Sequence, residues 1–235
     1  MSRLSEQVRS TKSRQTKSRP YRMRRRAELV DQTRQRIVEA AMNLHTTVGP
    51  ANTSISTVAE EAGVTRLTVY RHFPDIEELF AACHGHWFDL HRPPDVAAWR
   101  VIPDLEARAR RALGELYGWY RDNADDLYPI NRDAMTMPAG AQEARRAELA
   151  ALAGALVEGH PSGGRDGRQL HAVAGHLVSY WTWRSLVVEQ GLTNDEAVEV
   201  AVRILTETAG APWAIPPGRG PQVRRAPVAD RTSVV

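Results

Sequence analysis

The stretch Ser54-Ile-Ser-Thr-Val-Ala-Glu-Glu-Ala-Gly-Val-Thr-Arg-Leu-Thr-Val-Tyr-Arg-His-Phe73 predicts two short helices joined by a tight turn. Ser54 is a favourable N-cap, and the apolar residues behind it recur at three- and four-residue spacing, which predicts a first helix over about 55–62. Gly63 tolerates the positive φ with which a helix ends, and Thr65 can cap the next helix. This order of cap, helix, glycine and cap indicates a helix-turn-helix.

The second helix, from Arg66 to Phe73, combines an apolar side with many polar side chains. Leu67 or Val69, together with Phe73, should face the core, and Pro74 cannot continue the helix. If this were a hairpin buried in a core, each of its charges would need a buried partner. We therefore expect the polar side to face DNA, where Tyr70 and His72 would position phosphates and Arg66 or Arg71 would read bases. The predicted DNA-binding residues are Ser54, Thr65, Arg66, Thr68, Tyr70, Arg71 and His72.

The residues from Val58 to Leu79 resemble the amino-terminal signature of the tetracycline-repressor (TetR) family. The chain departs from that signature at two positions: it has Ile76 where many members carry lysine, and Leu67 where many carry a small residue. The resemblance is tight from about Arg34 and looser beyond Leu79. The apolar residues that resemble the family's first helix are Ile37, Ala40, Ala41, Leu44 and Val48, followed by Gly49.

The resemblance implies an all-α fold with an amino-terminal three-helix helix-turn-helix head and a larger helical body for ligand binding and dimerisation. It also implies a ligand-responsive transcriptional regulator, a repressor that binds a palindromic operator as a dimer and is released by a small molecule. Asp75 should cap the next helix, over about 76–90, and Glu78 should complete a capping box with it.

Charge is unevenly distributed along the 235 residues, whose formal net charge is +3. Residues 1–26 hold ten basic side chains against Glu6, a net charge of +9, and residues 211–235 carry four arginines against Asp230, a net charge of +3. This leaves −9 for residues 27–210. The amino-terminal stretch lacks apolar periodicity, so we expect a disordered basic arm that follows a DNA groove. A merely solubilising tail is the alternative.

The predicted organisation has four parts. Residues 1–26 form the disordered basic arm, 27–80 the helix-turn-helix domain, 81–210 the helical ligand-binding and dimerisation domain, and 211–235 a disordered tail rich in proline and arginine. The chain lacks an apolar run of about 18 residues and a secretory signal pattern, so we expect a cytoplasmic protein without a membrane partner. One cysteine, Cys83, suits a reducing compartment.

The body should contain a long helix over about 169–190 and a final helix to about 209, the latter capped by Thr193 and Glu196. Both are apolar on more than one face, which favours a homodimer through residues 169–209 over an internal hairpin. Large or aromatic side chains elsewhere could line a pocket for a small-molecule effector of unknown identity, although most should be ordinary core. The candidate ligand-binding residues are Trp119, Tyr120, Met135, His176 and Trp181.

Catalytic and metal sites are not predicted, and neither is a cofactor. His84 and His91 lie two turns apart on one helix face, about 10.8 Å, which is too far for both to hold one zinc ion. The glycine-rich loop at 159–167 lacks the Lys-Ser or Lys-Thr of a phosphate-binding loop, and a nucleophilic triad is not evident. Two alternatives remain: a helical enzyme or metal-sensing protein that binds nucleic acid incidentally, and a nonspecific nucleic-acid coating protein.

Overall fold

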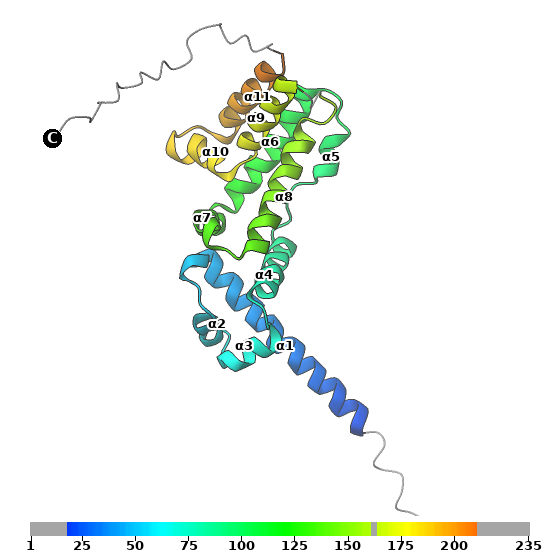
Figure 1. Ribbon diagram of the computed structural model, residues 1–235, viewed down its shortest axis with the longest axis vertical. Helices are drawn as coiled ribbons and strands as arrows, with labels where there is room; N and C mark the ends of the chain where they lie inside the picture. The colour runs from blue at the N-terminus through cyan, green and yellow to red at the C-terminus, as the bar shows by residue number, and fades with distance from the viewer. Residues whose placement is uncertain (1–17, 161–163, 211–235) are drawn as a thin grey trace, which may run out of the picture.

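The computed structural model describes residues 18–160 and 164–210, and over these ranges every regular element is helical. A small head contains the helix-turn-helix, and a larger body extends from it (Figure 1). The head elements are α1 (Ser18–Thr47), η1 (Pro50–Asn52), α2 (Ile55–Glu61), α3 (Arg66–His72) and the start of α4 (Ile76–Leu90). The body elements are α5 (Val96–Arg100), α6 (Leu105–Asp122), α7 (Ala124–Arg132), η2 (Ala134–Thr136), α8 (Ala139–Leu156), α9 (Gly164–Leu177), α10 (Tyr180–Arg184), the π-helix η3 (Ser185–Glu189) and α11 (Asn194–Gly210). The all-α prediction is confirmed.

The head has its own apolar core, built from the predicted faces of its helices. Ile37 and Ala41 of α1 pack with Val58 of α2 and with Val69 and Phe73 at the end of α3, and all five are buried. Gly63 joins α2 to α3 with φ of +64°, as the turn requires. The three helices therefore hold one another in a fixed arrangement, with α3 at the outer edge of the head (Figure 1).

Helix α1 begins earlier than the sequence analysis predicted, so the disordered arm is wrong for residues 18–26. These residues extend α1 past the head (Figure 1). Arginine and methionine, which supply six of these nine residues, are good helix formers, and the buried part of α1 supplies a nucleus from which the helix continues. Arg24 Nε also donates to Glu28 Oε1 at 3.2 Å, one turn away. The predicted arm over 1–17 and the predicted tail over 211–235 lie outside the described residues.

The body core lies mainly between α6, α8, α9 and α11, where leucines, alanines and aromatic rings interdigitate. Trp99 of α5 is buried in this core and donates from its indole to Glu115 at 2.7 Å. Thr193 and Glu196 form the predicted capping box ahead of α11, with the Glu196 amide donating to the Thr193 hydroxyl at 3.2 Å. Among the residues that the structure describes, no helix is long and apolar enough to span a membrane.

The long helix predicted over 169–190 is wrong, because the chain breaks at Val178 and Ser179 into α9, α10 and η3. Ser179 is extended and accepts a hydrogen bond from the Trp181 amide at 3.3 Å, so it caps a new helix. The break frees two backbone carbonyls, which buried tyrosines satisfy. Tyr117 donates to Leu177 O at 2.9 Å and Tyr120 donates to Val178 O at 2.7 Å.

Helix α4 belongs to both domains. Leu79 and Cys83 are buried in the head core, whereas Trp87 is buried in the body core. The predicted domain boundary at residues 80 and 81 therefore falls inside a helix that is continuous through both cores. The predicted capping box at its start is also wrong: Asp75 caps the Glu77 amide at 3.0 Å, while Glu78 pairs with Arg34 of α1 at 3.6 Å.

Candidate DNA-binding surface

The inner side of α3 is fixed by two apolar side chains. Val69 is fully buried and Phe73 is 2% exposed, and both pack in the head core. The sequence analysis left Leu67 and Val69 as alternatives for the inner side, and the structure selects Val69. Because Leu67 lies about 200° from Val69 around the helix, it faces outward and is 79% exposed.

The predicted hydroxyl residues lie at the two helix starts of the motif. Ser54 accepts a hydrogen bond from the Thr57 amide at 3.2 Å, and Thr57 Oγ1 accepts one from the Ser54 amide at 2.9 Å. Thr65 accepts from the Thr68 amide at 3.2 Å, and the two threonine hydroxyls lie 3.0 Å apart. Ser54 and Thr65 are exposed and Thr68 is half-buried, so these groups fix the motif and border its outer surface.

The outer surface of α3 carries Arg66, Tyr70 and Arg71, all of which are exposed. Tyr70 and Arg71 lie about 100° and 200° from Val69 around the helix and therefore point away from the core, whereas Arg66, three residues before Val69, is exposed at the first turn of α3. His72 is half-buried beside them. Burial lowers the pKa of His72, and the positive charges of Arg71 and Arg34 lower it further. A neutral imidazole can both donate and accept hydrogen bonds, so this group can meet a phosphate or a base edge.

Arg34 of α1 is a cation near this surface that the motif alone did not indicate. Its guanidinium lies 4.4 Å from the centre of the Phe73 ring and 3.6 Å from Glu78. These two contacts hold Arg34 beside the end of α3. The sequence signal was weak, because Arg34 precedes the motif by twenty residues and only the packing of α1 against α2 and α4 brings it near the end of α3.

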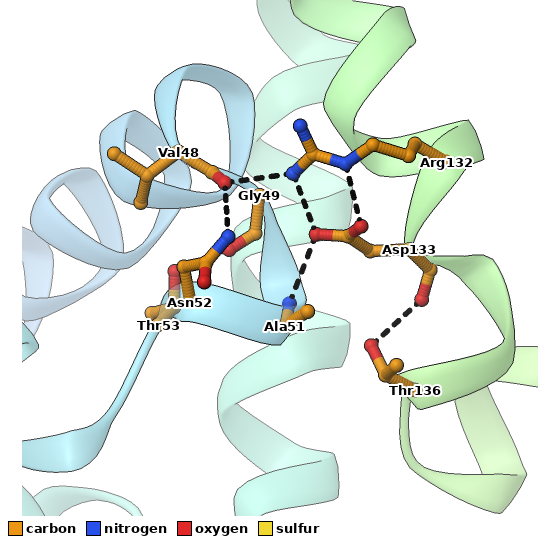
Figure 2. A network of polar contacts seen from close by, with 8 residues as sticks. All are labelled: Val48, Gly49, Ala51, Asn52, Thr53, Arg132, Asp133 and Thr136. Atoms are coloured by element: carbon orange, nitrogen blue, oxygen red, sulfur yellow. Dashed lines mark hydrogen bonds and ion pairs between the residues drawn. The ribbon is translucent and has the colours of Figure 1, made fainter.

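A polar network joins the head to the body where α1 turns into η1 (Figure 2). The Asp133 carboxylate is buried; it accepts from the Ala51 amide at 3.1 Å and from Arg132 at 2.7 Å. Arg132 also donates to Val48 O at 2.9 Å. The hydrogen bond from Arg132 lowers the pKa of Asp133, so the carboxylate stays ionised. The end of α7 thereby holds the backbone at the start of the helix-turn-helix.

Glycine is required where this network meets α1. Gly49 has φ of +93° and is buried against the side chains of Arg132 and Asp133. An added Cβ would overlap the Asp133 carboxylate and the Arg132 guanidinium. The close approach of backbone and carboxylate therefore depends on the missing side chain.

The five candidate ligand-binding side chains do not line a common cavity. Tyr120 is buried in the core and bonded to Val178 O, whereas Met135 is 82% exposed and His176 is exposed. Trp181 is 42% exposed, with its ring 6.2 Å from that of Tyr128. The break after α9 changes the direction of Trp181 alone, since the other four residues precede it, and the side of each helix that faces the core is set by packing that the sequence does not report.

Trp119 is the member of this set that borders a concave surface. Its ring stacks on Phe88 with 6.0 Å between centroids, and its indole donates to His91 O at 3.2 Å. It lines a shallow depression of about 410 Å³ together with Arg92, Arg111 and Asp122. Polar and aromatic groups thus meet between α6 and the segment that joins α4 to α5, on the body surface.

The helices predicted to form a dimer interface expose several large apolar side chains. Trp181 on α10, Val188 on η3 and Ile204 on α11 are all exposed, although α11 also packs on α6 and α9. The final helices therefore contribute one side to the body core and leave apolar groups on another.

Comparison with known proteins shows that the head is similar to one family. Residues 37–83 match the family described as bacterial regulatory proteins, tetR family. The HTH-type transcriptional regulator SrpR of Pseudomonas putida is 32% identical over 85 residues, which is 34% of this chain and 40% of that protein. The HTH-type transcriptional regulator AcrR of Shigella flexneri is 38% identical over 58 residues, 25% of this chain and 27% of that protein. The chain thus spans less than half the length of each of these two relatives.

The fold as a whole resembles a solved structure. A TetR-like transcriptional regulator from Rhodococcus sp. RHA1 superposes with a TM-score of 0.52 over 74% of this chain and 94% of that chain, at 22% sequence identity. At this identity the likeness concerns the arrangement of helices. It extends the agreement from the head to the helical body.

Proposed function

Because residues 37–83 match the family of bacterial regulatory proteins, tetR family, we propose that this protein is a ligand-responsive regulator that binds a palindromic operator and represses transcription. The observation that carries the proposal is the orientation of α3. Val69 and Phe73 face the head core, whereas Arg66, Tyr70 and Arg71 are exposed at the edge of the molecule. A helix presented in this way fits the major groove of B-form DNA.

The exposed residues of α3 have distinct roles in this proposal. Arg71 or Arg66 donates two hydrogen bonds to a guanine, since a guanidinium matches O6 and N7 of that base. Tyr70 and the neutral imidazole of His72 contact phosphates, together with the hydroxyls of Ser54, Thr65 and Thr68. Arg34 adds positive charge beside them. The base contacts specify the sequence and the phosphate contacts fix the register of the helix in the groove.

Arg71→Ala is expected to weaken operator binding by about 1 to 3 kcal/mol and to relax the base preference at one position of each half-site. The operator is first defined by selection of bound fragments from genomic DNA, and affinities are then measured by fluorescence anisotropy on every single-base variant. Recovery of sequences without an inverted repeat would contradict the proposal.

The matched control is Arg121→Ala, which removes an exposed arginine from the end of α6 in the body. It should leave both the affinity and the base preference unchanged. If Arg71→Ala lowered the affinity equally for operator and random DNA, a nonspecific coating protein would be the better description.

Deletion of residues 1–17 is expected to lower the salt dependence of binding more than its specificity. These residues hold five basic side chains, and each phosphate contact that is lost lowers the slope of log K against log salt by about 0.9. The ratio of specific to nonspecific affinity should persist, because α3 is intact. Deletion of residues 211–235, which hold four arginines, serves as the control and should leave the slope near its original value. An unchanged slope after the first deletion would show a solubilising role for the arm.

The proposed regulator acts as a homodimer through its last helices. One small head buries about 600 to 1,000 Å² on DNA, and a second head on the same site raises affinity through effective concentration. The exposed apolar groups on α10, η3 and α11 supply a surface that two copies could share. Two-fold symmetry would place the reading helices on the order of 34 to 36 Å apart or more, in successive major grooves.

The proposed effector is a small molecule that binds the body and shifts the heads through two links. One is α4, which contributes to both cores, and the other is the Arg132 and Asp133 network at the start of the helix-turn-helix. A displacement of α7 or α4 in the body would change the position of α3 relative to its symmetry mate. Such a ligand acts only to the extent that it binds the two arrangements with different affinity.

A further inference from the structure

Leu67 is the most unusual residue on the proposed DNA-binding surface. This leucine is 79% exposed, although the leucine of the adjoining core, Leu79, is almost completely buried. An apolar side chain of this size in water forgoes the stabilisation that its burial would provide. The neighbouring Val69 satisfies the core side of α3, so packing within the head does not require a leucine at position 67.

The surroundings of Leu67 favour a nucleic acid as its partner. One helical turn onward, at three- and four-residue spacing, lie Tyr70 and Arg71, which share its side of α3, and Arg66 precedes it directly. Helix α3 has two arginines and lacks acidic residues. The two arginines would have to be desolvated against an apolar protein partner, whereas they match the phosphates and guanines of a DNA groove.

The major groove offers one apolar group to such a side chain, the 5-methyl of thymine. A leucine placed against the polar edge of a guanine or cytosine would remove water from donors and acceptors and return no hydrogen bond. A contact with thymine instead buries the methyl and the leucine together. Leucine can therefore select a T·A pair by attraction to the methyl and by the cost of the alternatives.

We propose that Leu67 is a specificity-determining residue that packs on a thymine methyl at one fixed position of each operator half-site. This inference rests on the proposed function, since it assumes that α3 enters the major groove. It assigns to an apolar residue a part of the base reading that the sequence analysis gave to arginine. Because Leu67 and Arg71 lie one turn of α3 apart, the base pair that Leu67 contacts should lie close to the base that Arg71 reads.

The test uses the full-length protein and an operator recovered by selection. Each thymine of the half-site is replaced in turn by deoxyuridine, which lacks only the methyl, and affinity is measured for the wild type and for Leu67→Ala. At one position, deoxyuridine should weaken the wild type about 4-fold in one half-site and about 15-fold in both. Leu67→Ala should weaken binding to the thymine operator and should lose this sensitivity to deoxyuridine.

Two further variants make the result specific. Leu67→Met keeps an apolar side chain and should retain the thymine preference, whereas Leu90→Ala removes an exposed leucine on α4 and should leave the deoxyuridine effect unchanged. Circular dichroism melting checks that Leu67→Ala remains folded, as its exposure leads us to expect.

Several outcomes would overturn the inference. The first is an equal deoxyuridine effect in the wild type and Leu67→Ala at every thymine. The second is a uniform loss of affinity in Leu67→Ala for all bases, and the third is a change in its oligomeric state with unaltered DNA binding. Failure to recover any operator would instead refute the proposed function, so the two failures are distinguishable.

Discussion

Gly49→Ala should lower the free energy of unfolding by about 2 to 6 kcal/mol, from two contributions that add. Position 49 has φ of +93° and ψ of +158°, a backbone region that is essentially restricted to glycine and costs an alanine about 1 to 3 kcal/mol. The new Cβ would also overlap the Asp133 carboxylate and the Arg132 guanidinium. Moving Asp133 away breaks its hydrogen bond from the Ala51 amide inside a buried contact, which costs a further 1 to 3 kcal/mol or so.

Gly63→Ala is the matched control, because Gly63 also has a positive φ, +64°, but the nearest heavy atom to its added Cβ is 4.0 Å away. It should show the backbone cost alone, about 1 to 2 kcal/mol. Both variants are compared with the wild type by urea denaturation at pH 7.5. If the two substitutions cost the same, the network of Arg132 and Asp133 does not stabilise the contact between head and body.

Acidification from pH 7 to pH 4 should remove about 3 kcal/mol of stability through His45 alone. His45 is buried in the head core, where its ring lies 4.5 Å from Phe80 and its Nδ1 lies 3.5 Å from Cys83 Sγ. Burial lowers the pKa of His45 from 6.5 to about 4. Between these values the unfolded chain takes up a proton that the folded chain does not, so stability falls as the pH falls through this window. Below about pH 4 both states are protonated and the contribution stops changing.

The measurement is a series of urea denaturation curves from pH 7.5 to pH 4 for the wild type, His45→Gln and His176→Gln. Carboxylates also titrate at the acid end, so the informative quantity is the difference between the pH profiles. His45→Gln should have a flatter profile between pH 6.5 and pH 4.5, while the exposed His176→Gln should follow the wild type. Parallel profiles for the wild type and His45→Gln would show that the imidazole protonates in the folded head.

The adjacent thiol sets no further pH dependence in this range. Burial raises the pKa of Cys83 to about 12, so the thiol is neutral in both states below pH 7. It donates to Phe80 O at 3.3 Å. The contribution of this core pair to acid sensitivity therefore comes from the imidazole.

The head could be predicted closely from sequence because its signals are local. Ser54 and Thr65 cap the helices that the pattern assigned to them, and Val69 and Phe73, four residues apart, define the inner side of α3. The same helical geometry places Leu67 on the outer side of α3, because a residue about 200° from Val69 cannot share its face. The role of each exposed residue toward DNA stays a prediction.

The remaining features depend on contacts between distant segments. The break at Val178 becomes stable only because Tyr117 and Tyr120 on α6 reach its free carbonyls, and hydrophobic periodicity does not report such partners. Likewise, Asp133 accepts a hydrogen bond from the Ala51 amide, which lies 82 residues away in the sequence. The start of α1 was missed for another reason, because its arginine-rich composition resembles that of a disordered tail despite good helix propensity.

Because α4 contributes to both cores, it limits how hybrid proteins could be assembled from the head and the body of this chain. If the head were exchanged at residue 80, Cys83 would stay with the original body, although it is buried in the head core with Leu79. An exchange after residue 90 would carry Trp87 out of the body, where its indole donates to Asp126 at 2.9 Å. A stable hybrid must therefore join the two parent sequences between Cys83 and Trp87. Each hydrophobic interior then keeps the part of α4 that packs in it.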